Sequence, residues 1–530
     1  MKIILIGGTN AGFIAAERIR RMDEKAEILL LEEEEITLDI GVNFSYCVKN
    51  QYTKRERLLE FQRIFQVDIR MRTKVEGINN DEKYISIINL HNGVRYRENY
   101  DKIIITEGTP NYSTEFTLPD SEKIVFLDSH DKESQIKEYL SEYHPKQVLV
   151  YGMGEETVLI TDILNNIGCK VVLAGTHLEL LDDEINYKFF QELRTMGVDV
   201  ILRNPLREIT VYRDMIAAHF YKMGIAVDLV MICCDENPFL KEQFAMTKDG
   251  FLIVNEQMES SLQDVYVVGE TAKMAKSTLG KISYISLKNN IENQCRTAVD
   301  FIYGKKSRYS GSVTPMVIKC GEVYAARVGF LEKELKERNG YQIDYTAFLQ
   351  DSGNDSRIFI KLIFEKYNGK ILGVQALGRT DISAMCSLLA AAIRAESTIE
   401  DLAELELIDS PSSLPIQGPL SLAGVSALDI VNRFVREAQW SDTREREQYL
   451  DVRTSEEKKT GKIQGAISIP LEELRERMGE LDREKPVYVF SQYGGRGSIA
   501  CRILAQNGYS CYNMSGGYEL YKVFQKMDTK

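Results

Sequence analysis

The order of apolar and polar residues predicts buried strands that alternate with amphipathic helices along much of the chain. Near the N-terminus, a strand, a helix and a second strand are predicted at residues 2–6, 13–22 and 26–31. The same order returns at residues 147–151, 158–167 and 170–174. Strands that alternate with helices in this way are typical of parallel sheets. The pattern predicts an α/β fold with two Rossmann-like nucleotide-binding domains.

The pattern changes in the C-terminal half. Strands at residues 358–365 and 369–377 are followed by a helix at 382–395, a mixture that predicts an α+β domain. Residues 431–445 are largely polar and charged, which predicts a linker. Residues 446–530 alternate strands and helices again, which predicts a small separate α/β domain.

Composition narrows the classes of function. The 530-residue chain has a net charge of −13 and an ordinary hydrophobic share of 44%. Because an acidic surface repels nucleic acid and acidic membranes, neither is expected as a partner. No apolar run approaches the ~20 residues that span a bilayer, and the nine cysteines show no pairing pattern. We therefore expect a soluble, cytoplasmic protein.

The first predicted strand leads into a glycine-rich turn. Its sequence, Gly7-Gly8-Thr9-Asn10-Ala11-Gly12, is a Gly-x-x-x-x-Gly form of the dinucleotide-binding fingerprint. The first glycine permits the turn, the last allows helix and strand to pack closely, and the helix N-terminus offers N–H groups to a pyrophosphate. Glu32 ends the second strand, where a carboxylate can bind a ribose. A distant apolar run that ends in Gly269-Glu270 strengthens the prediction of a dinucleotide site.

These motifs, together with residues 362–373, 395–403 and 422–424, resemble the pyridine nucleotide-disulfide oxidoreductases over nearly the whole chain. The resemblance is to the branch that contains coenzyme A-disulfide reductases, NADH oxidases and NADH peroxidases. It implies a bound FAD, NAD(P)H as the usual electron donor and a homodimer. The FAD contacts that it implies are Gly7, Thr9, Asn10, Ala11, Gly12, Glu32, Val75, Gly108, Gly269 and Glu270, with Glu270 in place of the usual aspartate.

The resemblance also assigns the domains. Residues 1–110 and 246–315 form the expected FAD-binding domain, residues 111–245 an NAD(P)-binding-like domain, and residues 316–430 the α+β dimerisation domain. After the linker, residues 446–530 resemble rhodanese through Leu450-Asp451-Val452-Arg453 and through a later glycine-rich loop.

The redox cysteine of the family is missing from its expected position. In relatives it lies ten residues beyond the ribose carboxylate, and the same count from Glu32 reaches Val42. A valine side chain forms neither a thiolate nor a mixed disulfide. Cys47 could serve only if the helix register shifted. Asn10 replaces the histidine of the peroxidase branch, so neither disulfide nor peroxide reduction by the family mechanism is expected.

The nicotinamide half departs from the family as well. Its turn keeps Gly152 and Gly154, but Glu155 and Glu156 place negative charge where a pyrophosphate should bind. Farther along, the Cys233-Cys234 pair fills a loop that usually carries a small glycine. Binding of NAD(P)H is therefore an open question at this point.

The rhodanese-like loop, Ser491-Gln492-Tyr493-Gly494-Gly495-Arg496-Gly497, has lost its cysteine too. Backbone N–H groups of such a loop, together with Arg496, can bind an anion. Ser491 stands where the resemblance places the persulfide-carrying cysteine, and a serine hydroxyl without a neighbouring base is a poor nucleophile. Cys501, on the following helix, is interpreted as a core residue. Sulfur transfer at this loop is not expected.

A group of basic residues supports one class of ligand. Arg18, Arg20 and Arg21 lie on the first predicted helix, and Arg70 and Arg72 lie on a later strand. The coenzyme A branch uses basic residues in these regions to bind nucleotide phosphates, so coenzyme A or another thiol derivative is a candidate ligand. The alternative is a solvated positive face. No metal site is predicted.

Three functions follow from these observations. The first is an FAD-dependent oxidoreductase whose flavin passes electrons directly to an unknown acceptor. The second is a non-catalytic FAD-binding sensor or scaffold, because the expected cysteines are missing from two separate domains. The third keeps thiol chemistry through Cys47 or the Cys233-Cys234 pair. We favour the first, because a pure scaffold would have less use for a preserved FAD fingerprint.

Overall fold

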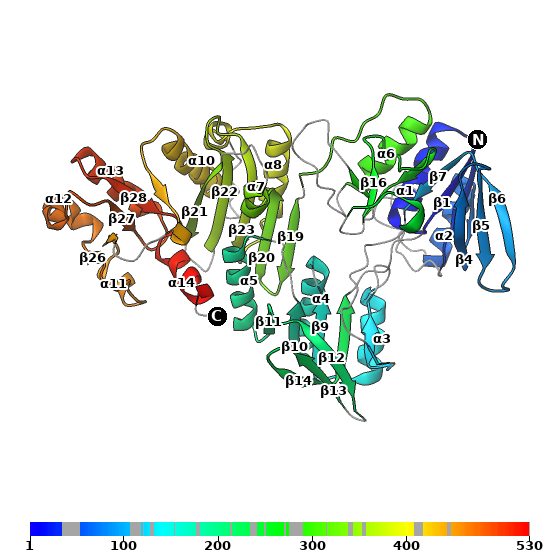
Figure 1. Cartoon of the computed structure of the whole chain (residues 1–530), viewed down its shortest axis with the longest axis horizontal. Helices are drawn as coiled ribbons and strands as arrows, with labels where there is room; N and C mark the ends of the chain where they lie inside the picture. Colours follow the sequence, from blue (N-terminus) through cyan, green and yellow to red (C-terminus); the bar gives the residue numbers. More distant parts are fainter. Residues whose placement is uncertain are drawn as a thin grey trace. The chain divides into compact units, whose positions relative to one another are not determined.

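The computed structural model describes residues 1–33, 54–106, 118–119, 121–127, 132–152, 154–175, 181–212, 215–233, 241–247, 251–269, 272–274, 290–313, 315–337, 343–351, 357–406, 417–442 and 447–528. The chain divides into two compact units, whose helices and strands are labelled in Figure 1. The first unit comprises residues 1–152 and 206–314, and the second comprises residues 153–205 and 315–530.

The first unit is built around a five-stranded sheet whose paired strands all run parallel. In spatial order its strands are β17 (Val265–Val267), β7 (Lys102–Ile105), β1 (Lys2–Ile6), β2 (Glu27–Leu31) and β3 (Val67–Arg70). Four of the five residues of both β1 and β2 are buried, which explains their continuous apolar sequences. Helix α1 (Asn10–Met22) connects these two strands and packs against α6 (Ile291–Ile302) and α2 (Lys54–Phe65).

Smaller sheets complete the first unit. The antiparallel strands are β4 (Thr73–Asn79), β5 (Tyr84–Asn89) and β6 (Arg95–Asn99), and β12 (Leu206–Val211), β13 (Ile216–Phe220) and β14 (Gly224–Val227). The parallel strands are β16 (Leu252–Val254) with β18 (Ala272–Met274), and β8 (Ile124–Phe126), β15 (Leu229–Cys233) and β9 (Gln147–Gly152). Helix α3 (Lys132–Tyr143) and the short helix η1 (Lys241–Gln243) lie between strands along the chain.

The second unit begins with a helix–strand–helix–strand segment and continues into an antiparallel sheet. The segment contains α4 (Glu155–Ile167), β10 (Lys170–Gly175), α5 (Asp183–Thr195) and β11 (Asp199–Leu202). The sheet has the order β19 (Met316–Cys320), β20 (Val323–Gly329), β23 (Ile371–Gly378), β22 (Arg357–Glu365) and β21 (Ile343–Asp351). Its helices are α7 (Glu332–Lys336), α8 (Ser383–Arg394), α9 (Ile399–Ala403) and α10 (Gln417–Val431). Every residue of β23 is buried, so the centre of this sheet forms a core.

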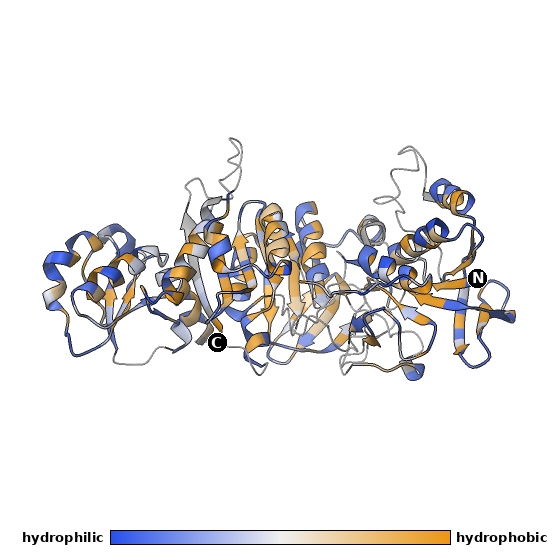
Figure 2. Cartoon of the chain, turned by 90° about the horizontal axis from the view of Figure 1, so that it is seen from above, coloured by the Kyte–Doolittle hydropathy of each residue, from blue (hydrophilic) through white to orange (hydrophobic). Residues whose placement is uncertain are grey.

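The C-terminal part of the second unit is a parallel five-stranded sheet. Its order is β24 (Glu437–Ala438), β28 (Cys511–Met514), β27 (Val487–Phe490), β25 (Gln448–Asp451) and β26 (Ile467–Ser468). Its helices are α11 (Ser455–Lys458), α12 (Leu474–Arg477), α13 (Gly495–Gln506) and α14 (Gly517–Asp528), with short helices η2 (Trp440–Asp442), η3 (Leu471–Glu473) and η4 (Met478–Glu480). In Figure 2, hydrophobic residues are concentrated in the strands and polar residues on the helices' outer faces.

The predicted fold class is confirmed, but the predicted linker differs from the structure. Residues 437–438 form strand β24, which pairs with β28, and Trp440 is buried against the rings of Phe490 and Tyr521. The indole N–H of Trp440 donates a hydrogen bond to the Gly517 carbonyl at 3.0 Å. The segment therefore belongs to the C-terminal sheet. Its polar composition hid an edge strand, because such strands are short and pair on one side only.

No helix in the described ranges is both long enough and apolar enough to cross a membrane.

Candidate functional site

The turn between β1 and α1 forms the best-defined candidate site in the first unit. Gly7 follows β1 with a φ of 111°, which favours glycine, and α1 begins three residues later at Asn10. The side chain of Thr9, the N-cap residue, makes no capping bond, because its hydroxyl donates to the Thr106 carbonyl at 3.1 Å. The Thr9 side chain therefore leaves the first N–H groups of α1 uncapped. A pyrophosphate can bind there only if these groups are not capped by a side chain.

Gly12 allows the helix to approach the strand. A Cβ at this position would lie 2.4 Å from the carbonyl oxygen of Gly7 and 3.3 Å from the Thr106 hydroxyl oxygen. The first of these contacts is to backbone, so a side chain would force the turn to move. The predicted role of Gly12 in close packing is therefore consistent with the geometry of the turn.

Glu32 follows β2 and reaches the same turn. Its side chain is 4% exposed, and one carboxylate oxygen accepts the Gly8 N–H at 2.5 Å. A carboxylate has lone pairs for several donors, so a carboxylate held here can also accept hydrogen bonds from ribose hydroxyls. The geometry fits an adenosine ribose beside a pyrophosphate on α1.

The distant Gly269 also comes to this turn. Its backbone has a φ of 100°, and its Cβ position would lie 4.0 Å from the Cβ of Ala11. The N–H of Gly269 donates to the side-chain oxygen of Gln294 at 2.8 Å. Gln294 is fully buried, and among the described residues its Nε2 has no hydrogen-bond partner. An unpaired buried donor beside the turn fits a site that receives a polar group of a cofactor.

Sequence reasoning missed two residues that support this site. The Thr106 hydroxyl donates towards the Gly7 carbonyl at 2.8 Å, and Gln294 holds the Gly269 backbone. The only sequence signal for Gln294 was a polar residue on the buried face of an amphipathic helix. Val75 lies in β4 and is buried. The predicted residues Val42, Cys47, Gly108 and Glu270 lie outside the described residues.

The residues of the second nucleotide turn lie at the ends of their elements. Gly152 ends β9, and Gly154 caps α4 with a φ of 94°. Glu155 and Glu156 occupy the first turn of α4, where negative side chains stabilise the helix dipole. The same charges oppose a second anion at this helix end. Cys233 is the buried last residue of β15.

The loop between β27 and α13 is the second candidate site. Ser491 is 1% exposed, and its hydroxyl oxygen accepts the Gly494 N–H at 3.0 Å. Gly517 closes the loop from the other side, since a Cβ there would lie 2.4 Å from the Ser491 carbonyl. The Ser491 hydroxyl thus stabilises the loop conformation.

Arg496 of this loop forms an ion pair with Glu457. Burial opposes ionisation of Glu457, but hydrogen bonds from the Thr454 backbone and from Arg496 lower its pKa below the usual range. The ion pair with Glu457 therefore holds Arg496 at the start of α13, where its positive charge can also attract an anion.

Comparisons with known proteins identify the family. Residues 1–300 match the family model described as pyridine nucleotide-disulphide oxidoreductase. The chain belongs to the pyridine nucleotide-disulphide oxidoreductase family. Residues 317–412 match the dimerisation domain of this family, and residues 437–523 match the rhodanese-like domain. The predicted resemblance is confirmed, and membership of this family implies FAD and NAD(P)H as cofactors.

Two relatives in this family show the breadth of the match. The coenzyme A disulfide reductase of Staphylococcus haemolyticus (strain JCSC1435) is 22% identical over 451 residues, which cover 81% of this chain and 100% of the relative. The NADH oxidase of Enterococcus faecalis (strain ATCC 700802 / V583) is 23% identical over 435 residues, which cover 78% and 96%. Both similarities extend beyond the FAD-binding part of the chain.

Solved structures extend the similarity to the C-terminal domain. Reduced CoADR-RHD of Bacillus anthracis has a TM-score of 0.87 and 28% identity, with 98% of each chain covered. A NAD-dependent persulfide reductase from A. fulgidus has a TM-score of 0.84 and 25% identity, with 98% of this chain and 100% of that chain covered. The oxidoreductase domains and the rhodanese-like domain that follows them therefore occur in the same order in solved proteins.

Arg20, one of the predicted phosphate contacts of this family member, has another role in the structure. It is 7% exposed, and all five of its N–H groups donate to backbone carbonyls. The acceptors include Phe65 at the end of α2 and Ala26 before β2. The guanidinium fastens α1 to its neighbours and has no remaining donor for a phosphate.

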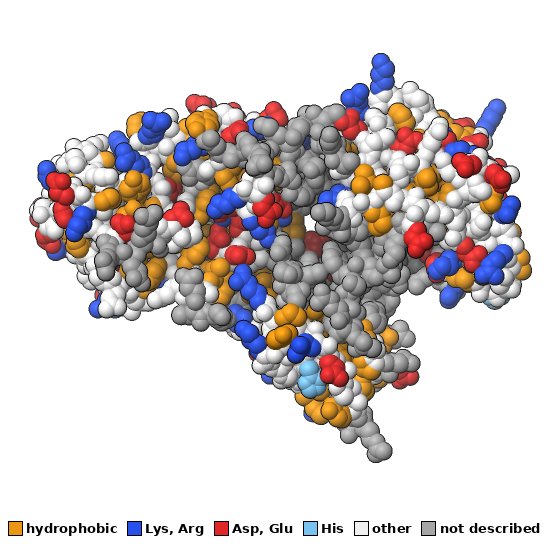
Figure 3. All heavy atoms as spheres, in the orientation of Figure 1, with side chains coloured by type: hydrophobic (Ala, Val, Ile, Leu, Met, Phe, Trp, Pro, Cys, Tyr) orange, Lys and Arg blue, Asp and Glu red, His pale blue; other side chains and the backbone are white. Residues whose placement is uncertain are grey.

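The other predicted basic contacts have carboxylate partners or lie in a turn. Arg18 pairs with Asp300 at 2.6 Å, Arg21 pairs with Glu17, Arg70 pairs with Asp68 and Glu98, and Arg72 has a φ of 52°. Acidic and basic side chains are interspersed on the face drawn in Figure 3. A phosphate ligand would have to compete with these carboxylates, so the coenzyme A contact stays a prediction.

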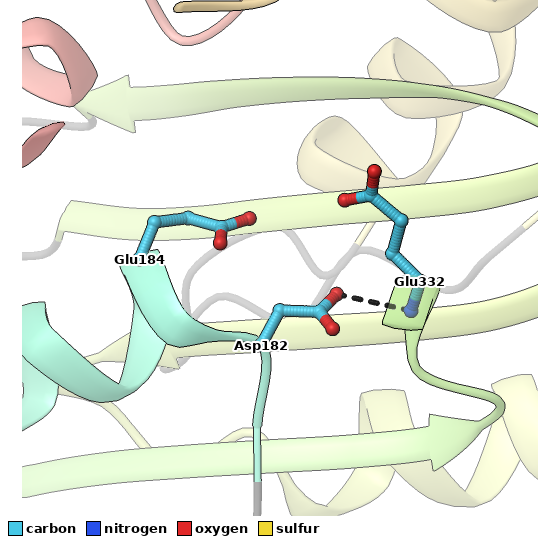
Figure 4. Close-up of side chains that lie close together, drawn as sticks. All are labelled: Asp182, Glu184 and Glu332. Atoms are coloured by element: carbon cyan, nitrogen blue, oxygen red, sulfur yellow. Dashed lines mark hydrogen bonds between the residues drawn. The ribbon is translucent and has the colours of Figure 1, made fainter. Parts of the chain in front are cut away.

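The second unit contains three carboxylates arranged like the ligands of a metal. Asp182 and Glu184 come from the start of α5 and Glu332 from α7, and the three side chains converge (Figure 4). However, the ammonium of Lys361 lies 2.8, 2.5 and 2.6 Å from their respective oxygens and is fully buried. The ammonium occupies the position that a cation would need, so this cluster is an ion-pair network.

The network fixes the start of α5 on the antiparallel sheet. Burial by itself would lower the pKa of Lys361, but Glu184 and Asp182 raise it well above its usual range. Burial raises the pKa of Glu184, despite the attraction of Lys361. Gln375 completes the network, because its Oε1 accepts the Asp182 backbone N–H and its Nε2 donates to the Asp182 carboxylate. Removal of Lys361 would leave the buried carboxylates of Asp182 and Glu184 without the counter-charge that it supplies.

We expect Gly12→Ala to weaken FAD binding. The added Cβ meets the Gly7 carbonyl, and overpacking of this kind costs about 1–3 kcal/mol, which corresponds to roughly 5–150-fold in the dissociation constant. FAD titration of the flavin-free protein measures the change. Gly479→Ala is the matched control, because a Cβ there has no atom within 4 Å. Equal affinity in both variants would contradict the assignment of this turn.

We expect Lys361→Met to lower the free energy of unfolding by about 3–5 kcal/mol near neutral pH. The unpaired carboxylates then have folded-state pKa values above their unfolded values. The stability that a raised pKa supplies is present at low pH and lost at high pH, so the deficit should shrink towards pH ~5. Denaturant unfolding followed by circular dichroism tests this.

Lys336→Met is the control for this change. Lys336 also pairs with Glu332, but its side chain is 65% exposed, so its loss should cost at most about 1 kcal/mol. A pH-independent deficit in Lys361→Met, or equal deficits in the two variants, would show that the network is not held by charge.

Proposed function

We propose that this chain is an FAD-dependent oxidoreductase whose flavin passes electrons directly to an acceptor, without a cysteine relay. The observation that supports it best is the complete dinucleotide turn, in which Glu32, Gly12 and the N-terminus of α1 converge. When bound, FAD supplies the electron-transfer chemistry of such an enzyme.

The residues of the turn have distinct parts in this proposal. The first N–H groups of α1, beside Thr9, bind the pyrophosphate, and the Glu32 carboxylate binds the adenosine ribose. Gly7 and Gly12 keep the backbone close enough for both contacts. The Nε2 of Gln294 supplies a further donor beside Gly269.

Direct transfer is proposed because the chain lacks a thiol at two positions where the family resemblance expects one. Val42 stands at the first position, in a segment outside the described residues. Ser491 stands at the second, where its buried hydroxyl supports the loop by accepting the Gly494 N–H. The rhodanese-like domain is accordingly proposed to bind an anion near Arg496 rather than to transfer sulfur.

The electron donor and the ligand class are part of the same proposal. Two relatives are a NADH oxidase and a NAD-dependent persulfide reductase, which supports NAD(P)H as the donor here. The coenzyme A disulfide reductases among the relatives support coenzyme A or a related thiol as the ligand. The dimerisation-domain match supports a homodimer.

A second candidate, the non-catalytic FAD-binding sensor or scaffold, is favoured by the same two missing thiols. It differs from the first in one measurable respect, because a sensor need not be reduced by NAD(P)H. Thiol chemistry through Cys47 or the Cys233-Cys234 pair is the third candidate. It requires that replacement of these cysteines abolish disulfide-dependent NADH oxidation.

We expect anaerobic titration with NADH to bleach the bound flavin near ~450 nm with a stoichiometry of one. Glu155→Gln combined with Glu156→Gln should lower the NADH concentration for half-reduction by about three-fold or more, because two negative charges leave the helix end. Glu472→Gln, a charge change in the C-terminal domain, is the control. A flavin that stays oxidised under excess NADH and NADPH would leave the sensor as the better proposal.

We expect Ser491→Cys to create thiosulfate sulfurtransferase activity that the natural chain lacks. A thiolate at this position would lie in a loop that leads into the N-terminus of α13, beside Arg496, and both lower the pKa of a thiol. Cyanide-dependent formation of thiocyanate measures the transfer. Ser498→Cys adds a thiol on the same helix outside the loop and should stay inactive. Sulfurtransferase activity in the natural chain would contradict the proposal that Ser491 prevents sulfur transfer at this loop.

A further inference from the structure

Two cysteines of the C-terminal domain, 10 and 20 residues after Ser491 in the sequence, lie close to each other in the fold. Cys501 is on α13 and Cys511 is the first residue of β28, where the chain returns beneath the helix. The thiol of Cys511 donates a hydrogen bond to the Cys501 carbonyl at 3.2 Å. The two cysteines therefore meet across a helix–strand contact.

The two thiols differ in their electrostatic surroundings. Contact with Cys501 lowers the pKa of Cys511 against the effect of burial, and the positive charges of Arg436 and Arg502 lower it further. Burial raises the pKa of Cys501 well above its usual range, and its contact with Cys511 raises it further. The two arginines thus favour the thiolate of Cys511 while burial keeps Cys501 protonated, an asymmetry that dithiol redox sites use.

The pair also differs from other buried cysteines of the chain. Burial raises the pKa of Cys295, Cys320 and Cys386, which makes these thiols inert. Cys511 is 6% exposed and Cys501 is 1% exposed, so a small oxidant meets Cys511 first. Contact, charge and access therefore all select Cys511 as the reacting thiol.

We propose that Cys501 and Cys511 form a dithiol–disulfide redox pair that is oxidised by hydrogen peroxide. The Cys511 thiolate attacks one peroxide oxygen, the O–O bond breaks, and the leaving hydroxide takes up the proton that the thiol released and departs as water. The resulting sulfenic acid is attacked by the Cys501 sulfur, the S–O bond breaks, and a second water leaves. Two thiols lose two electrons in total, and one peroxide is reduced to two waters.

The disulfide would tether α13 to β28. Helix α13 begins in the loop that contains Ser491 and Arg496, so oxidation would fix the helix that supports the candidate anion site. This pair is independent of the flavin, because both thiols lie in the C-terminal sheet and its helix. The inference therefore goes beyond the proposed electron transfer at FAD.

Peptide mapping of the intact protein tests the pair. Trypsin cuts after Arg496, Arg502 and Lys522, so the two cysteines fall in separate peptides, 497–502 and 503–522. After treatment of the folded protein with hydrogen peroxide and alkylation of the remaining thiols, we expect these peptides to be recovered linked. Reduction should separate them again. Recovery of both peptides alkylated and unlinked would overturn the proposal, as would linkage only in denatured protein.

Two variants assign the roles of the thiols. In Cys501→Ser, the sulfenic acid of Cys511 has no partner, so dimedone should label peptide 503–522 after peroxide treatment. In Cys511→Ser, labelling of peptide 497–502 should stay at background, because Cys501 is not the thiol that peroxide attacks first. Cys386→Ser, which removes a buried thiol of the antiparallel domain, should leave the linked peptides unchanged. Dimedone labelling of Cys501 rather than Cys511 would contradict the proposed order of attack.

Discussion

The close approach of helix α1 to strand β1 is the constraint on which the candidate flavin site depends. The Gly12 backbone is so near the Gly7 carbonyl that no side chain fits between them. This approach places the helix N-terminus at the end of the sheet, where Glu32 from the neighbouring strand also arrives. Because parallel strands end on the same edge, Gly269 joins them from more than two hundred residues away. A dinucleotide site follows from backbone geometry, with few side chains required.

Buried cations have structural roles in both units. The Arg20 guanidinium donates hydrogen bonds to backbone carbonyls, and the Lys361 ammonium forms ion pairs with carboxylates. The Arg453 guanidinium pairs with the Asp451 carboxylate and lies over the ring of Tyr518. Burial of each of these charges without its partners would carry a large desolvation free energy. The anion sites that we propose therefore rely on backbone N–H groups at helix N-termini and on partly exposed side chains such as Arg496.

The thiols of the C-terminal domain lie at other positions than the one where the family resemblance places the persulfide-carrying cysteine. The loop at Ser491 keeps the shape of an anion-binding loop, held by the hydroxyl and by Gly517. A pair of thiols lies instead on the helix that follows and on the neighbouring strand. The proposed direct electron transfer and the proposed thiol pair are consistent with each other, since neither requires sulfur transfer at Ser491.

The sequence by itself determined the strands and helices of the nucleotide turns, the family and the position of the rhodanese-like loop. Local periodicity and glycine spacing carry this information, because strand, turn and helix depend on neighbouring residues. Only the tertiary structure decided that the Arg20 guanidinium donates all its hydrogen bonds to backbone carbonyls and that the Lys361 ammonium lies among the three carboxylates. It also decided that Trp440 is buried in the C-terminal core and that Cys501 contacts Cys511. These outcomes depend on which distant groups the fold brings within a few ångströms, and one residue's chemistry does not specify its partner.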